Sequence, residues 1–333
     1  MIWFEFVLCV AVITVAGLKL SRYGDAIADK TGLGGTWIGV ILLATVTSLP
    51  ELVTGITSVT VANAPDIAVG DIMGSCVFNL SIIVILDFLH RKESVYSRAS
   101  QGHILSAAFG IMLIGFTGFN ILLSTQGGNF EIGHVGLYSP FIMFFYLIMM
   151  RTVYRYESAQ IEKFTVAEED QYPNLSKRQA IIRYFIAAGF VVVAGSFLPF
   201  IGKQIAEHMD WYESFVGTLF IAFATSLPEI VVTVAALRVG AIDMAIGNLF
   251  GSNLFNILII GIDDIFYTQG SLLKAVSPTH AVSALSAIMM TGVAIAGLFY
   301  HPRTRVLKMV GWASIILFCV YLLNTYIMFI YGH

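Results

Sequence analysis

Two identical pentapeptides, each ending in a glutamate, contain the residue types that could bind a metal cation. The sequence TSLPE occupies residues 47–51 and again residues 225–229, and both copies lie inside apolar stretches. A proline inside a helix removes one backbone donor and frees the carbonyl group four residues before it. The freed carbonyl groups here are those of Val46 and Ala224. Because a glutamate follows each proline directly, we expect carboxylate, carbonyl and hydroxyl oxygens to gather at both places. All-oxygen sites suit hard cations such as Ca²⁺ and Na⁺.

A second motif follows each pentapeptide. The sequence IAVGDIMGSCVFNLSII at 67–83 aligns with MAIGNLFGSNLFNILII at 244–260. Each copy carries an acid or an amide between two glycines, and small residues allow helices to pack closely. The offset is 178 residues for the first motif and 177 for the second, so one unit is repeated along the chain. The predicted cation site combines both copies and contains Glu51, Glu229, Asp71, Asn248, Thr47, Thr225, Ser48, Ser226, Ser75, Ser252 and the carbonyl groups of Val46 and Ala224.

The two glutamates are predicted to be ion ligands rather than packing residues. An ionisable side chain inside a membrane span usually has a functional role. A packing role would call for a basic partner, but no lysine or arginine lies at comparable depth, and Arg238 stands at a helix end. Asn79 and Asn256, later in the second motif, are predicted to tie helices together.

The elements that must position these residues are predicted to be membrane-spanning helices. The chain has 333 residues, of which 57% are hydrophobic and only 12% charged, and its mean hydropathy is +0.83. An ordinary soluble domain carries about 25% charged residues, so this composition excludes one. The apolar runs are continuous, which favours helices, because only helices and closed barrels satisfy their backbone in lipid. Ten spans are predicted at 3–20, 37–62, 66–87, 102–124, 135–154, 180–201, 212–237, 242–262, 280–300 and 306–330.

The charges of the connecting segments predict how the spans are oriented. If the N-terminus lies outside, sixteen of the 18 lysines and arginines fall on the cytoplasmic side, and only Lys203 and Lys274 lie outside. This is the distribution that the positive-inside rule requires, so both termini are predicted to lie outside. The polar stretch 156–178 is then a cytoplasmic linker between two halves of five spans, residues 1–155 and 179–333. Since five is odd, the halves must have inverted topology, and their repeated units span about 37–87 and 212–262.

Both motifs resemble those of the cation/calcium exchanger superfamily, which includes the sodium/calcium exchangers. That superfamily carries two inverted repeats, each with [GAT]-[TS]-S-x-P-E followed by G-[ND]-x-x-G-S-N-x-x-N, and both copies have counterparts here. The ten-span layout and central loop are also similar, so the resemblance covers the chain. It implies a secondary antiporter whose ions occupy one site alternately. It further implies that Ca²⁺ is held by Glu51, Glu229, Asp71 and Asn248, and Na⁺ by backbone carbonyls and by Thr47, Ser48, Thr225 and Ser226.

The sequence departs from the superfamily pattern at positions that bear on sodium. Related sequences often carry a serine a few residues before the G-[ND] pair, whereas this chain has Ile67 and Ala68 in one copy and Met244 and Ala245 in the other. This change removes potential Na⁺ ligands from both halves. Cys76 also replaces the asparagine of the motif, at a position where we expect packing.

Charge balance leaves two coupling ions open. Glu51, Glu229 and Asp71 supply at most three negative charges, so one Ca²⁺ leaves a single charge that a proton on Asp71 could cancel. Three Na⁺ would neutralise all three. Burial favours the neutral form of a carboxyl group, so protons are expected to compete with any ion. The main prediction is Ca²⁺ exchange against Na⁺, and the alternative is a Ca²⁺/H⁺ antiporter.

Other functional classes fit the sequence less well. A channel is disfavoured because inverted repeats with broken helices are typical of transporters. An enzyme is disfavoured because the seven histidines stand mostly at span ends or in loops, away from TSLPE, and no GxSxG or HExxH motif occurs. A third alternative is an assembly or receptor protein whose carboxylates are vestigial. Substitution of Glu51 or Glu229 by glutamine distinguishes it, because only a carrier would lose Ca²⁺ binding. We therefore predict no catalytic residues and no resident cofactor, and as partners the lipid bilayer and inorganic cations but no nucleic acid. The expected location is the plasma membrane, or the inner membrane of a bacterial cell.

Overall fold

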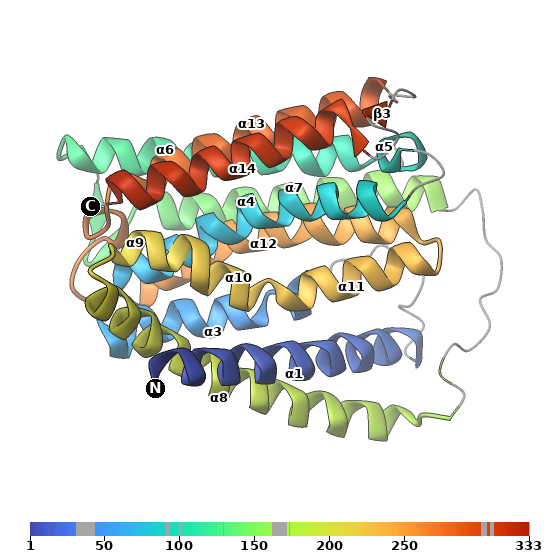
Figure 1. The fold of residues 1–333 in the computed structure, drawn as a ribbon, viewed down its shortest axis with the longest axis horizontal. Coiled ribbons are helices and arrows are strands. Elements are labelled where there is room, and N and C mark those ends of the chain that lie inside the picture. Colours follow the sequence, from blue (N-terminus) through green and yellow to red (C-terminus); the bar gives the residue numbers. More distant parts are fainter. Residues whose placement is uncertain are drawn as a thin grey trace.

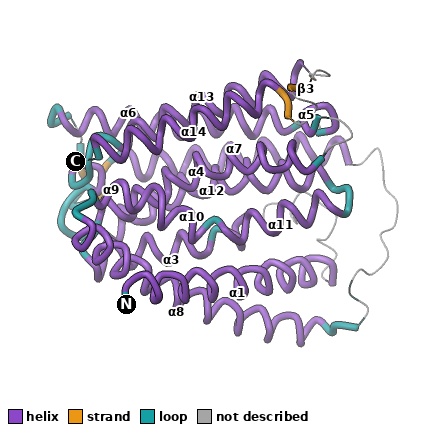
Figure 2. The backbone as a smooth tube through the Cα atoms, viewed as in Figure 1, coloured by secondary structure: helices purple, strands orange, loops and turns teal. Residues whose placement is uncertain are grey.

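The structure, a computed structural model, is a bundle of long helices that run roughly along its longest axis (Figure 1). The part of the chain that it describes is nearly all helical (Figure 2). Two short antiparallel hairpins connect α6 to α7 and α13 to α14. The described residues are 1–30, 44–90, 94–99, 102–128, 130–161, 172, 174–300, 305–306 and 310–332.

The elements of the described chain are long helices, shorter helices, and a few turns and short strands. The long helices are α1 (Ile2–Lys30), α4 (Pro65–Leu89), α6 (His103–Thr125), α7 (Tyr138–Ile161), α8 (Lys177–Met209), α12 (Ile242–Phe266), α13 (His280–Tyr300) and α14 (Trp312–Tyr331). The shorter helices are α3 (Leu49–Thr57), α5 (Val95–Arg98), α9 (Glu213–Val216), α10 (Ala222–Thr225) and α11 (Leu227–Arg238). The remaining elements are the π-helical turns η1 (Ser58–Ala62) and η2 (Gly217–Ile221), the 3₁₀ turn η3 (Leu272–Lys274), and the strands β1 (Glu131–Ile132), β2 (Val135–Gly136), β3 (Arg305–Val306) and β4 (Val310–Gly311).

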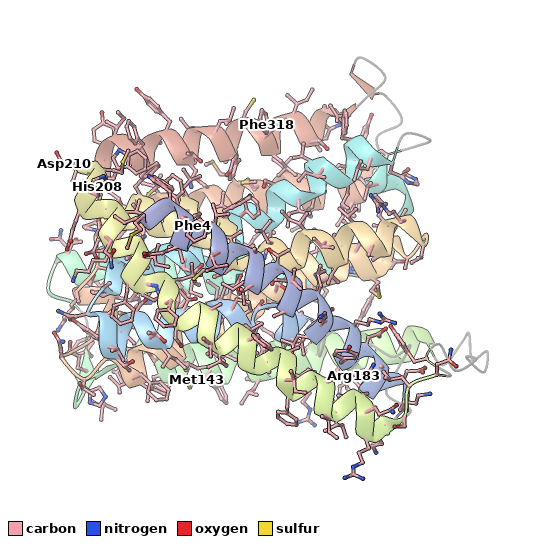
Figure 3. The ribbon with its side chains drawn as sticks, turned by 60° about the horizontal axis from the view of Figure 1, so that its bottom comes forward. Phe4, Met143, Arg183, His208, Asp210 and Phe318 are labelled. Atoms are coloured by element: carbon pink, nitrogen blue, oxygen red, sulfur yellow. The ribbon has the colours of Figure 1, made fainter. Side chains whose placement is uncertain are left out.

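The bundle has the dimensions and surface of a membrane protein. Within the described residues, seven helices are long and apolar enough to cross a membrane, and the bent pair Glu213–Thr225 and Leu227–Arg238 makes up to eight. Large apolar side chains cover the outside, including Phe4 and Phe318 (Figure 3). Two of the ten predicted spans fall outside this set: 37–62 begins outside the described residues, and 135–154 corresponds to α7, which is helical but is not among the seven.

The two termini lie at one end of the bundle, and α7 ends and α8 begins at the other (Figure 1). We call these the terminal end and the linker end. Helix α7 continues to Ile161, beyond residue 156 where the predicted linker begins; residues 162–171 and 173 lie outside the described residues. Helix α8 begins at the capping box of Ser176 and Gln179. A helix satisfies its own backbone hydrogen bonds and can therefore extend beyond the apolar layer of the membrane. The length of an apolar run in the sequence does not show how far the helix continues.

Helices α4 and α12 form the centre of the bundle. Their most apolar windows are 78% and 83% buried, compared with 22% for α1 and 28% for α14. Two histidine–aspartate pairs bind the starts of these central helices. His280 Nε2 lies 2.9 Å from Asp66 Oδ1 at the start of α4, and His103 Nε2 lies 3.0 Å from Asp243 Oδ1 at the start of α12. Each pair joins the part of the chain before the linker to the part after it.

The far ends of α4 and α12 are held by two aspartates, each of which accepts several hydrogen bonds. Asp264 accepts from the backbone of Gly136 and Leu272 at 2.8 and 2.7 Å, and from the hydroxyl groups of Tyr138 and Ser139. Asp87 accepts from the backbone of Val95 and Gly311 at 3.3 and 2.7 Å and from Ser314 at 2.8 Å. Both aspartates are fully buried. They anchor the connections that return the chain to the bundle.

The hairpin at the terminal end carries an ion pair. Lys274 Nζ lies 2.7 Å from Glu131 Oε1. The hydrogen bond from Lys274 lowers the pKa of the Glu131 carboxyl group. Because both side chains are partly open to solvent, this pair contributes little to stability. Lys274 is one of the two basic residues predicted to lie outside, and its position near the termini agrees with their predicted common side.

Candidate cation site

Both TSLPE segments break a helix at the serine. Residues 44–47 are helical, the chain turns at Ser48, and α3 begins at Leu49. The second copy repeats this: α10 ends at Thr225, the chain turns at Ser226, and α11 begins, with a bend of 44°. The backbone angles at the two serines are nearly equal, with φ −86° and ψ 14° at Ser48 and φ −85° and ψ 5° at Ser226. The proline takes the second position of each new helix, where a missing N–H costs nothing.

The break exposes backbone carbonyl groups at the centre of the bundle. Pro50 and Pro228 have no N–H, so the carbonyl groups of Val46 and Ala224 cannot accept the usual bond within the helix. The predicted freed carbonyl groups therefore lie where two helix ends meet. Val46 is 8% exposed and Ala224 is fully buried. The structure places both in the same region as the glutamates that follow.

The two glutamates are bound crosswise. Ser48 in the first copy donates to Glu229 Oε1 in the second at 3.3 Å. Ser226 in the second copy donates to Glu51 Oε1 in the first at 3.2 Å. All four side chains are fully buried. The structure thus brings together the two TSLPE segments, which are separated by 178 residues, as the sequence predicts.

Asp71 and Ser75 of α4 complete one side of this cluster. Thr225 donates to Asp71 Oδ1 at 2.8 Å, and the hydroxyl oxygens of Ser226 and Ser75 lie 2.9 Å apart, within hydrogen-bond distance. Ser75 in turn lies 3.4 Å from Glu51 Oε1 and 3.4 Å from Asp71 Oδ1. These hydroxyl groups connect the two carboxylates, and burial is complete at all five positions.

The other side of the cluster differs in chemistry. Thr47 and Ser252 lie 3.4 Å apart and share a hydrogen bond. Asn248 donates to Thr233 Oγ1 at 3.3 Å, one helical turn beyond Glu229, and not to the break itself. Thr233 was not predicted; its spacing of four residues from Glu229 on one helix face was the signal that could have found it. A neutral amide and hydroxyl therefore stand on this side, opposite Asp71.

Asn79 has the structural role predicted for it. It donates to Asn253 Oδ1 at 3.1 Å, and Asn253 donates to the carbonyl group of Cys76 at 3.1 Å. These bonds tie α4 to α12 at the middle of both helices. Cys76 is fully buried, as expected of a packing residue.

Each predicted ligand with a carboxylate or amide group keeps one buried oxygen without a hydrogen-bond partner. These oxygens are Glu51 Oε2, Glu229 Oε2, Asp71 Oδ2 and Asn248 Oδ1. Buried polar atoms are normally bonded, so four such oxygens in one region indicate room for a positively charged partner. None of the ion pairs in the described part of the chain involves the three carboxylates. The same part contains no three acidic, histidine or cysteine side chains gathered closely enough to hold a metal by themselves. Hydroxyl groups separate the carboxylates.

Glycines let α4 approach the broken helix. A Cβ atom at Gly74 would lie 2.7 Å from Thr218 Cα and 2.8 Å from Ala222 Cβ. At Gly70 it would lie 3.1 Å from Gly217 Cα. Because backbone atoms cannot move aside as a side chain can, these glycines hold Asp71 and Ser75 against the second break, as predicted from the motif.

Replacing Gly74 with alanine is expected to destabilise the protein and weaken the site. The added methyl group overlaps backbone, and overpacking of this kind costs about 1–3 kcal/mol. We expect a lower melting temperature in detergent, measured by size-exclusion chromatography of samples heated to increasing temperatures. Gly110→Ala is the matched control, because a Cβ there meets no atom within 4 Å. Equal melting temperatures for the Gly74 variant and the wild type would contradict this packing.

A family model described as "Sodium/calcium exchanger protein" matches residues 1–155 and 180–329. The chain is 26% identical over 249 residues to the uncharacterized membrane protein MJ0091 of Methanocaldococcus jannaschii, covering 72% of this chain and 76% of that protein. It is 25% identical over 276 residues to the sodium/calcium exchanger MaX1 of Methanosarcina acetivorans, covering 74% and 77%. It is 23% identical over 300 residues to the Ca(2+)/H(+) antiporter ChaA of Bacillus subtilis, covering 85% and 82%.

Solved structures have the same fold. The H+/Ca2+ exchanger CAX matches 98% of this chain and 84% of its own with a TM-score of 0.72, at 13% identity. The sodium-calcium exchanger NCX_Mj matches 97% of this chain and 98% of its own with a TM-score of 0.62, at 20% identity. At these identities the likeness establishes the fold and leaves the transported ions open.

Proposed function

Because the chain belongs to the sodium/calcium exchanger family, we propose that it is a secondary antiporter that exchanges Ca²⁺ against Na⁺ by alternating access. The observation that carries this proposal is the crossed pairing of Glu51 and Glu229 with the serines of the opposite copy. It brings carboxylate and hydroxyl oxygens together, with no lysine or arginine among the buried residues that the structure describes. Ca²⁺ prefers shells of oxygen ligands. Transport, rather than catalysis, is the activity that such a site supports, and the ions are its substrates.

The ligands of Ca²⁺ are proposed to be Glu51, Glu229, Asp71 and Asn248. Each keeps a buried oxygen without a partner, and a cation placed among them would give all four a partner at once. The hydroxyl groups that now separate the carboxylates supply further oxygens. We propose that Na⁺ uses these hydroxyl groups and the freed carbonyl groups: Thr47, Ser48, Thr225, Ser226, Ser75, Ser252, Val46 and Ala224.

We further propose that the chain consists of two inverted five-span halves, residues 1–155 and 179–333. Corresponding residues supply corresponding contacts: Asp87 and Asp264, which lie 177 residues apart, each accept from a backbone N–H eight residues later. The histidine–aspartate pairs are likewise related by 177 residues. Asn253 donates to the carbonyl group of Cys76, its own counterpart. Contact between counterparts is what an approximate two-fold axis produces.

The orientation proposed for the protein places the terminal end outside the cell. Support comes from charge: of the basic residues, Lys203 and Lys274 alone belong to the side of the termini in the predicted topology, and the other sixteen to the linker side. Positive residues accumulate on the cytoplasmic side. The proposed membrane is therefore the plasma membrane, or the inner membrane of a bacterial cell, with the 156–178 segment in the cytoplasm.

A second coupling ion has specific support. Ile67, Ala68 and Ala245 are fully buried and carry no oxygen in their side chains. They occupy positions where a serine could add a Na⁺ ligand beside the site. If fewer oxygens are available for Na⁺, protons on the buried carboxylates become the alternative driving ion, and the protein would be a Ca²⁺/H⁺ antiporter.

Uptake of radioactive Ca²⁺ into proteoliposomes tests both versions. We expect uptake when Na⁺ is loaded inside and absent outside, and the same uptake with the membrane potential clamped. A pH gradient without Na⁺ is the parallel arm, and empty liposomes are the control. Uptake that follows the pH gradient and ignores Na⁺ would replace the sodium version with the proton version. No uptake under either gradient would overturn the proposed exchange.

A further inference from the structure

A fourth carboxylate is buried near the site. Asp263 of α12 is 1% exposed, and neither of its oxygens has a hydrogen-bond partner. Its neighbour Asp264 is equally buried but accepts four hydrogen bonds. None of the ion pairs within the described residues involves Asp263. A buried carboxylate without a protein partner must be neutralised by a proton or by a cation, and the surroundings of Asp263 decide between these.

Asp263 faces the helix that carries Glu51. A Cβ atom at Gly55 would overlap the Asp263 carboxylate, lying 2.9 Å from its Cγ. Gly55 follows Glu51 by one helical turn on α3, on the side of the terminal end. The absence of a side chain at residue 55 therefore leaves the space that the carboxylate occupies. Asp71 lies on α4, which packs against both α3 and α12, and its Oδ2 also has no partner.

The polar face of α12 leads from the central site to Asp263. On an ideal helix, Asp263 lies roughly 60° around the axis and about 22 Å along it from Asn248. Two further polar residues, both buried, lie on this face between them: Ser252 and Asn256. The face thus continues from the central site toward the terminal end, where a cation from that side would arrive.

The repeat does not account for Asp263. At the offset of 177 its counterpart in the first half is Leu86, and the counterpart of Gly55 at the offset of 178 is Thr233. In the linker-end half of the site, Thr233 accepts from Asn248 at 3.3 Å, and Leu86 is an apolar core residue. That side therefore has a neutral threonine hydroxyl, bonded to Asn248, where the terminal-end side has a glycine packed against a buried carboxylate. The extra charge is specific to one side.

We propose that Asp263 and Asp71 form a second cation-binding position on the terminal-end side of the central site. It would take the same class of ligand, a hard cation such as Ca²⁺ or Na⁺, and the identity of that cation rests on the proposed function. With Glu51 and Glu229 the region holds up to four negative charges, so one Ca²⁺ leaves two uncompensated. A Ca²⁺ ion beside Asp263 would compensate both, and a Na⁺ ion one of them; either gives an arriving cation a position from which to displace the one that leaves.

Equilibrium binding of radioactive Ca²⁺ to the purified full-length protein in detergent tests this position. Glu229→Gln disables the central site, and we expect weaker but measurable Ca²⁺ binding to remain. Adding Asp263→Asn to Glu229→Gln is expected to remove the remaining binding. Asp263→Asn alone is expected to weaken Ca²⁺ binding by about tenfold. Asp210→Asn is the matched control: the residue is exposed at the terminal end, and its positive φ of 55° is one that asparagine tolerates.

A second variant acts on the same position without removing charge. Gly55→Ala places a methyl group where the Asp263 carboxylate lies, and we expect the same loss of Ca²⁺ affinity. Melting curves in cation-free buffer verify that each variant is folded. Wild-type affinity in Asp263→Asn, together with unchanged residual binding in the double variant, would overturn the proposal and leave Asp263 as a protonated packing residue. The exchange itself is tested separately: if the wild type moves no Ca²⁺ under any gradient, the proposed function fails, whereas Ca²⁺ binding that depends on Asp263 still supports the second position.

Discussion

Replacing either Glu51 or Glu229 with glutamine is expected to abolish Ca²⁺ uptake into proteoliposomes, with at least a 100-fold loss of rate. Each glutamate combines a serine bond from the other copy with a buried free oxygen. Glutamine keeps the size of the side chain but removes its negative charge. Because the interior screens charge weakly, losing one of the few charges that hold a divalent cation costs several kcal/mol, and each 1.4 kcal/mol is about a factor of ten in affinity.

The same two substitutions are expected to leave the fold intact. In the absence of cations the carboxylates repel one another, so removing one charge relieves that repulsion. The melting temperature in cation-free detergent should therefore remain the same or rise. Glu207→Gln, the same change at an exposed position of α8, serves as the control and should transport as the wild type does. Normal Ca²⁺ binding in both glutamine variants would show that the cation site lies elsewhere.

The sequence alone predicts the meeting of the two TSLPE segments, because its reasons are local. A proline must break a helix, a buried charge needs a partner, and two copies at one offset imply one duplicated unit. Those arguments place Ser48, Ser226, Glu51 and Glu229 together, and the structure brings them within hydrogen-bond distance. The glycines of the second motif are predictable in the same way, because small residues allow helices to pack closely. The structure shows such an approach at Gly70 and Gly74.

What the sequence does not predict depends on contacts across the bundle. Asp263 stands next to Asp264, and in the sequence the two are alike. Only the fold shows that one accepts four hydrogen bonds and the other accepts none, because three of the four donors belong to Gly136, Tyr138 and Ser139, at least 125 residues earlier in the chain. Hydropathy also does not show that α7 ends at Ile161 and that α8 begins at Lys177. It marks the apolar layer, whereas the backbone hydrogen bonds of a helix can continue beyond that layer.

Replacing Asp264 with alanine is expected to destabilise the protein strongly, by about 3 kcal/mol or more. The substitution leaves two backbone N–H groups and two hydroxyl groups without their acceptor. Each buried donor left unsatisfied costs about 1–3 kcal/mol. Water entering the space recovers part of this cost, so the sum is an upper limit. The connection between α6 and α7 and the turn after α12 should loosen together, because Asp264 joins both.

Asp263→Ala is the sharpest control for this prediction. It removes the same group from the next residue of the same helix, yet it breaks no hydrogen bond, because neither Asp263 oxygen has a partner. In cation-free buffer, where binding cannot stabilise the fold, its melting temperature should equal or exceed that of the wild type, while that of Asp264→Ala falls by several degrees. Equal losses in the two variants would mean that burial of charge, and not hydrogen bonding by Asp264, determines stability at this end of α12. A loss in Asp264→Ala alone would assign the adjacent aspartates opposite tasks, one holding the fold and the other left unpaired at the ion site.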